Sequence, residues 1–135
     1  MTTKLTTLTL MTAFGLALTA AAADTAQLPP AATKTGVTYA TDIKPILDVS
    51  CVKCHSGEKP KAHLKLDTLE GVLKGSGHGK VIVPGKSTES KLVLAVAHIG
   101  EEDEFMPPPD NKAHIPPLTP AQVGLIRAWI DQGAK

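Results

Sequence analysis

The apolar residues after position 38 are spaced as in helices rather than as in strands. Ile43, Ile46 and Leu47 stand at positions i, i+3 and i+4, which places them on one helical face. Thr41 is the expected N-cap of this helix, because threonine hydroxyls accept hydrogen bonds from the free N–H groups of a first turn. We therefore predict a helix that begins after Thr41 and runs into Cys51.

Two more short helices are predicted in the middle of the chain. The first covers residues 68–74, with Asp67 as its cap and Gly75 as its stop. The second covers residues 88–98 and ends at Gly100. Its apolar stripe consists of Leu92, Val93, Val96 and Ile99.

The last helix has the clearest start signal in the sequence. Thr119 is followed by Pro120 and, two residues later, by Gln122, which is the pattern of a capping box with proline at the first helical position. The helix is expected to run to about Asp131. Its predicted buried face consists of Val123, Ile126 and Ile130, with Trp129 beside them.

The segments between these helices are irregular. The chain contains 11 prolines and 11 glycines, and the run Phe105–Pro109 (FMPPP) favours an extended path. Residues 24–38 are rich in Ala, Thr and Pro without periodicity and are expected to form a flexible linker. Residues 39–135 are therefore predicted to be one all-α domain of three to four short helices with Gly/Pro-rich loops.

Residues 1–23 have the pattern of a secretory signal peptide. Lys4 is their single charge, the rest is mostly apolar or threonine, and Ala21 and Ala23 fit an A-x-A cleavage site before Asp24. An uncleaved membrane anchor is the alternative, and the threonines and weakly apolar alanines disfavour a stable span. We expect cleavage near Ala23-Asp24 and a periplasmic or secreted protein without a membrane span.

The mature chain is expected to be neutral. Removing Lys4 leaves 14 − 1 = 13 basic residues against 13 acidic ones. This balance argues against nucleic acid or an anionic membrane as the main partner. The core also looks poor, because Tyr39, Phe105 and Trp129 are the only aromatic residues after position 23. Such a domain would benefit from a large apolar group to fold around.

The chemistry of the chain concentrates in Cys51-Val52-Lys53-Cys54-His55. C-x-x-C-H is typical of c-type haem attachment. Residues three and four apart share a helical face, so Cys51 and Cys54 direct both sulfurs the same way, toward the haem vinyl groups. His55 follows on the same side and is the expected proximal ligand of the haem iron.

Three other uses of the two cysteines are weaker. A zinc site requires four ligands, and the histidines after residue 55 do not form a His-x₃₋₅-His pair. A thioredoxin-like redox pair requires an α/β context that this pattern lacks. A structural disulfide would close a very short loop, which gives little stabilisation.

Met106 is the candidate ligand for the other face of the iron. It is the only methionine after residue 23 and lies in the proline-stiffened loop. A thioether ligand raises the haem potential and closes the site to small molecules. The alternatives are a gap-filling core methionine or a histidine as sixth ligand.

The remaining polar residues receive less specific interpretations. We interpret His98 as a partly buried or capping residue, and His63, His78 and His114 as solvated loop residues. The acidic run Glu101–Glu104 is interpreted as a solvated surface. Steering of a basic partner by this charge is the alternative.

Five segments together resemble the planctomycete-type cytochrome c domain, within the class I cytochrome c-like group. They are YATDIKPILDVSCVKCH, LKLDTLEGVLKG, VIVPGKSTESKLVLAVAH, FMPPP and LTPAQVGLIRAWIDQGA. The resemblance spans residues 39–134. It implies an all-α fold around one covalent haem c, with Cys51 and Cys54 as attachment positions, His55 as proximal ligand and Met106 as distal ligand. It also implies that Gly124 permits close contact near Tyr39 and Ile43.

The sequence thus predicts a periplasmic monohaem electron carrier. It would exchange single electrons with redox partner proteins as a monomer and perform no bond chemistry of its own. If Met106 does not bind iron, a five-coordinate haem sensor or a peroxidase-like protein is the alternative. A third hypothesis is an interaction module in which the haem is only structural.

Overall fold

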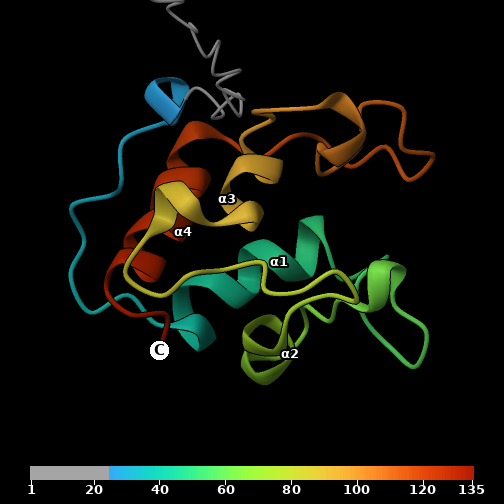
Figure 1. The fold of residues 1–135 in the computed structure, drawn as a ribbon, viewed down its shortest axis with the longest axis horizontal. Helices are drawn as coiled ribbons and strands as arrows, with labels where there is room; N and C mark the ends of the chain where they lie inside the picture. The colour runs from blue at the N-terminus through green and yellow to red at the C-terminus, as the bar shows by residue number, and fades with distance from the viewer. Residues whose placement is uncertain (1–24) are drawn as a thin grey trace, which may run out of the picture.

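The computed structural model describes residues 25–135, which fold into short helices joined by long loops (Figure 1). The predicted signal peptide, residues 1–23, lies outside the described residues. Within 25–135 no strand forms, so the all-α prediction is confirmed. The α-helices are α1 (Lys44–Ser50), α2 (Leu69–Lys74), α3 (Lys91–Val96) and α4 (Pro120–Asp131).

The first predicted helix forms in two parts. A π-helical turn, Tyr39–Ile43, precedes α1, and Thr38 caps it in place of Thr41. Pro45 explains the change of hydrogen-bond register, because it has no N–H to donate to the fourth residue before it. The preceding N–H, that of Lys44, donates to the oxygen of Tyr39, five residues back.

The third predicted helix is also divided. A 3-10 turn, Ser87–Glu89, is separated from α3 by Ser90, whose backbone is extended. The Ser90 hydroxyl accepts from the Val83 N–H at 3.0 Å and donates to the Lys86 oxygen at 2.9 Å. This side chain offers the backbone an alternative to a continuous helix.

The capping predictions for the other two helices have different outcomes. Thr68, rather than Asp67, caps α2 and accepts from the Gly71 N–H at 3.1 Å. At α4 the predicted capping box is present, since Thr119 and Gln122 bond to each other's backbone N–H groups. Local signals therefore placed α4 correctly and missed the cap of α2 by one residue.

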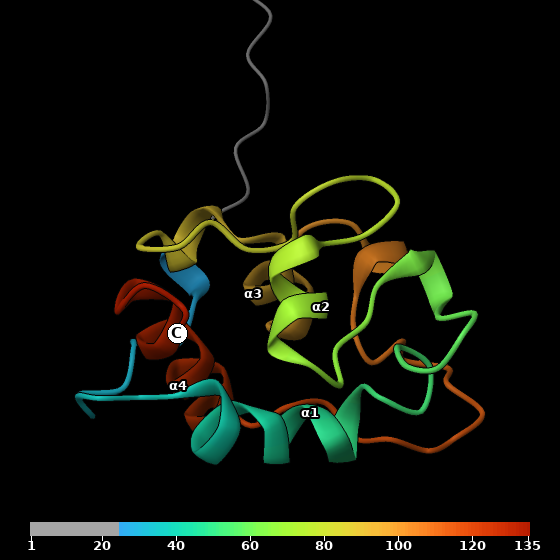
Figure 2. The same ribbon diagram turned by 90° about the horizontal axis from the view of Figure 1, so that it is seen from below.

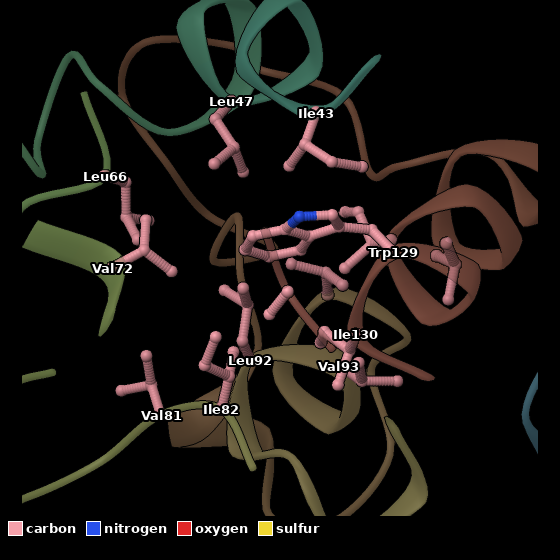
Figure 3. Close-up of a cluster of buried hydrophobic side chains, with 14 of the residues drawn as sticks. Ile43, Leu47, Leu66, Val72, Val81, Ile82, Leu92, Val93, Trp129 and Ile130 are labelled. Atoms are coloured by element: carbon pink, nitrogen blue, oxygen red, sulfur yellow. The ribbon is translucent and has the colours of Figure 1, made fainter. Parts of the chain in front are cut away.

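Trp129 occupies the centre of the core. Figure 3 shows its ring between Ile43 and Leu47 on one side and Val93 of α3 on the other, and all four side chains are fully buried. Tyr39 packs against the same ring, with 5.9 Å between centroids. Trp129 thus joins the start of the domain to α3 and α4.

The segment before Tyr39 is packed rather than free, which differs from the predicted flexible linker over residues 24–38. Residues 28–37, here called the strap, run along α4 at the left edge of Figures 1 and 2. Leu28 and Val37 are buried in the hydrophobic core. The sequence of the strap shows no helical or strand periodicity of apolar residues, because the strap is an extended segment of which only Leu28 and Val37 are buried in the core.

Hydrogen bonds to α4 and to its C-cap fix the strap. The Ala32 N–H donates to the Gly124 oxygen at 2.9 Å. The Gln132 side-chain amide donates to the Lys34 oxygen at 2.8 Å. Both bonds join residues more than 90 positions apart, so no local sequence signal predicts them.

Gly124 is required by the strap rather than by a contact with Tyr39 or Ile43, which corrects the role that the resemblance implied. A Cβ at Gly124 would lie 2.6 Å from the Pro30 backbone oxygen and 3.5 Å from the Ala32 nitrogen. The first distance is too short for any carbon–oxygen contact. The missing side chain therefore lets the strap cross α4 closely.

The substitution Gly124→Ala tests this crossing. Alanine favours a helix over glycine by about 1 kcal/mol, but a clash with a backbone carbonyl cannot be relieved by a rotamer change. We expect the clash to dominate and G124A to lower the free energy of unfolding by about 1–3 kcal/mol, measured by urea denaturation of the exported protein.

The matched control carries G124A together with a deletion of residues 28–33. Without Pro30 and Ala32, the part of the strap that crosses Gly124, the same substitution should be neutral or should stabilise the protein by up to about 1 kcal/mol. An equal loss of stability in both backgrounds would show that the strap does not need glycine at this position.

Candidate functional site

Cys51, Cys54 and His55 lie in one hydrogen-bonded turn that continues α1. The Cys51 N–H donates to Leu47 at 2.8 Å, and the N–H groups of Cys54 and His55 both donate to the Cys51 oxygen, at 3.1 and 3.0 Å. The spacing predicted such a turn, and the structure contains it. Both thiols are free.

Burial controls the state of the first thiol. Cys51 is buried within the hydrophobic core, whereas Cys54 is half-buried. Burial, followed by the neighbouring Cys54, raises the pKa of the Cys51 thiol to about 12. Cys51 is therefore a neutral S–H group at neutral pH.

His55 is a buried imidazole with an unused nitrogen. Its side chain is only 8 % exposed, and Nδ1 has no hydrogen-bond partner. Burial lowers the pKa of His55; the nearby backbone groups of Lys61 and Leu64 oppose this shift, and the charge of Lys61 adds to it. The ring is thus kept neutral with a lone pair, as a metal ligand requires.

The backbone of His55 is tied to the core through Leu66. The Leu66 N–H donates to the His55 oxygen at 2.8 Å, and the Tyr39 hydroxyl donates to the Leu66 oxygen at 3.0 Å. Because Tyr39 packs on Trp129, the position of His55 follows from the packing at the centre of the core. Sequence reasoning did not identify Tyr39 as part of the site, since its partners are remote in the chain.

Met106 is held by the end of α3. Its N–H donates to the Ala95 oxygen at 3.0 Å, and its half-buried side chain packs against the core. Further along the loop, the Asn111 side chain bonds to Pro108 and Ile115 at 2.8–2.9 Å. Asn111 was also missed, although an asparagine between prolines is a known turn signal.

The other interpreted side chains lie as follows. His98 is half-buried and stacks on Phe105 with 4.7 Å between ring centroids. His63, His78 and His114 are exposed, as the solvated interpretation expects. The acidic residues at 101–104 are exposed as well, and two of them border a surface hollow of about 570 Å³ with Pro108, Pro109 and Asp110.

The two halves of the predicted site lie at the same end of the molecule. In both views the green segment after α1 and the orange loop that follows α3 share the right-hand side (Figures 1 and 2). In the part of the chain that the structure describes, no group of three or more His, Cys, Asp and Glu side chains is arranged to hold a metal ion.

The comparison with protein families agrees with this arrangement. Residues 51–110 match the family described as Planctomycete cytochrome C. This segment is similar to the planctomycete-type cytochrome c domain. No significant match was found among curated proteins or among solved structures.

Cytochromes c of this family carry covalently bound haem c, which is the cofactor of this domain. The residues present fit the group chemically. Two free thiols stand one turn apart, and His55, the residue after Cys54, has a neutral ring with an unpartnered nitrogen. Over residues 25–135 no helix is both long and apolar enough to cross a bilayer.

Tyr39→Phe tests the link between the core and His55. The substitution removes the hydroxyl donor to the Leu66 carbonyl and is expected to cost about 1–2 kcal/mol of stability at neutral pH. Burial, followed by the charges of Asp48 and Asp67, raises the pKa of Tyr39 from 10.0 to about 12.

This pKa shift gives the prediction a pH dependence. The folded protein binds the tyrosine proton more tightly than the unfolded chain, so this stabilisation is present below about pH 10 and is lost as the pH rises toward 12. The difference in unfolding free energy between wild type and Y39F should therefore shrink over that window. A difference that is unchanged from pH 8 to pH 12 would contradict a buried, hydrogen-bonded hydroxyl.

Proposed function

We propose that this protein is an exported monohaem c-type cytochrome that carries single electrons between redox partner proteins. The observation that carries the proposal is the turn in which two free thiols stand beside a buried, neutral imidazole. When bound, haem c supplies one-electron exchange between its ferric and ferrous states. The protein supplies the ligands, the apolar surroundings and the position of the group.

Cys51 and Cys54 attach the haem in this proposal. Each thiol adds across one vinyl group, forming a sulfur–carbon bond while the thiol hydrogen passes to the other vinyl carbon. No atom is lost, so the mass increases by that of one whole haem. The neutral state of the Cys51 thiol keeps it in the protonated form that this addition consumes.

His55 and Met106 are the proposed axial ligands. Both come from backbone that is fixed by hydrogen bonds, His55 through Leu66 and Met106 through Ala95. A site whose ligands are held before an electron arrives needs little rearrangement when the iron changes charge. This property suits an electron carrier better than an enzyme that must open a coordination position for a substrate.

The proposed division of the chain follows the same logic. Residues 1–23 act as the export signal, which delivers the chain to the periplasm, where c-type haem attachment takes place. Residues 24–38 precede the cytochrome c domain of residues 39–135, and the strap within them packs onto that domain. The protein is proposed to act as a monomer.

Mass spectrometry and the pyridine haemochrome of the exported protein test the proposal. We expect the mass of residues 24–135 plus one haem, with a spectrum typical of two thioether bonds. The double variant C51A/C54A should be colourless, with the mass of the bare polypeptide. Wild-type protein that is colourless at the bare mass would refute the proposal.

Met106→Ala tests the distal ligand. A thioether raises the haem potential, and axial ligands set haem potentials over a range of about 0.8 V. M106A should therefore lose the far-red charge-transfer band of an iron–methionine bond, bind CO in its ferrous form, and fall in potential by about 0.1 V or more.

Val49→Ala is the matched control, because Val49 is 75 % exposed and takes no part in the site. It should leave the band, CO binding and the potential unchanged. If wild-type protein already lacks the band and binds CO rapidly, the five-coordinate sensor or peroxidase-like function is favoured instead.

A further inference from the structure

The C-terminal end of α3 holds the Met106 loop at two points. One is the hydrogen bond from the Met106 N–H to the Ala95 oxygen at 3.0 Å. The other is the parallel stack of His98 on Phe105, with 4.7 Å between centroids and 9° between planes. Two neighbouring loop residues are thus anchored by two residues from one helix end.

The backbone of His98 is unusual in a way that this stack explains. Its φ of 54° lies in the left-handed region, which a residue with a Cβ enters only at an energetic cost. The chain turns back after α3 at this residue, and the turned backbone presents the imidazole ring to Phe105. The His98 ring therefore packs against Phe105 of the Met106 loop instead of pointing into solvent.

One atom of this ring remains unexplained. Nε2 of His98 is buried and has no hydrogen-bond partner among residues 25–135. Burying a ring nitrogen without a partner is costly, so such atoms in native proteins indicate a partner that the polypeptide does not supply. His55 Nδ1 is the only other histidine nitrogen in this state over the same residues.

The haem offers one kind of partner for this nitrogen. Apart from its iron and ring nitrogens, haem c is apolar, and its two propionates are its only peripheral polar groups. A propionate is an acceptor with negative charge, which makes a hydrogen bond from an N–H donor stronger than one between neutral groups.

We propose, on the basis of the function proposed above, that His98 is a positioning residue of the haem site. Its ring holds Phe105, and with it Met106, while its Nε2–H donates a hydrogen bond to a haem propionate. The same side chain thus links the loop of the distal ligand to the periphery of the haem.

Two substitutions separate these two roles. His98→Phe keeps an aromatic ring for Phe105 and removes the N–H donor. His98→Asn suits the left-handed backbone and removes the stack. His114→Phe is the control, since His114 is exposed and also has a positive φ, 52°, but has no ring partner.

Nuclear magnetic resonance of the ¹⁵N-labelled ferrous protein gives a direct readout. In wild type we expect an exchange-protected His98 Nε2–H signal with nuclear Overhauser contacts to the propionate methylene protons. This measurement needs no variant, so it decides the proposal even if a substitution prevents folding.

The variants give a second readout. H98F should keep the far-red band and lower the reduction potential, because the propionate charge is then less compensated and favours the ferric iron. H98N should raise ferrous CO binding roughly two- to tenfold, the factor that the loss of one aromatic pair implies. H114F should match wild type in both measurements.

Three results would overturn the proposal, and one of them concerns more than His98. A coloured protein whose His98 Nε2–H has no contact with a propionate overturns the proposal, because that hydrogen bond is its central claim. An H98F potential equal to that of wild type is the corresponding result from the variants. A spectrum of two histidine ligands that persists in M106A and is lost in H98F would make His98 an iron ligand instead. A colourless wild-type protein would refute the proposed function itself.

Discussion

The packing of Tyr39 on Trp129 is the interaction on which the rest of the domain depends. Trp129 is fully buried between the first helical segment and α3, and its indole N–H donates to the backbone oxygen of Lys135 at 2.9 Å. Tyr39 connects this core to the site, because its hydroxyl donates to the Leu66 oxygen and the Leu66 N–H donates to the His55 oxygen. The core and the His55 half of the proposed haem site are therefore held together by one chain of contacts.

The two halves of the site are supported in different ways. His55 belongs to a turn closed by local backbone bonds and attached to the core centre. Met106 belongs to a proline-rich loop that is attached to the end of α3 and is closed further along by the bonds of Asn111.

The sequence predicted what local chemistry determines. The capping box at Thr119 and the helical spacing around Cys51 depend on neighbouring residues, and both elements lie close to their predicted places. Two helix boundaries differ from the prediction. The Ser90 side chain competes for backbone hydrogen bonds, and Pro45 has no backbone N–H to donate. The roles of Cys51, Cys54, His55 and Met106 as haem ligands stay predictions, although the fold places their segments at one end.

Long-range contacts were beyond the reach of the sequence pattern. The Arg127 guanidinium donates to the Pro29 oxygen across 98 positions, and nothing in the Ala/Pro-rich composition of the strap indicates that partner. The same holds for the hydrogen bond from Tyr39 to Leu66, which joins residues 27 positions apart. Such hydrogen bonds form only when the helices pack together around one core, so helix-forming patterns in the sequence do not predict them.

The close crossing at Gly124 also has a consequence for comparing related chains. In a relative with a larger residue at this position, the Cβ would lie 2.6 Å from the backbone oxygen that Pro30 supplies here. The segment before the domain must then follow another path in that relative, or be absent. The two features should therefore vary together among homologues: glycine where the segment before the domain lies on the last helix, and larger residues where it does not. A single column of a future alignment would then show which family members share this arrangement.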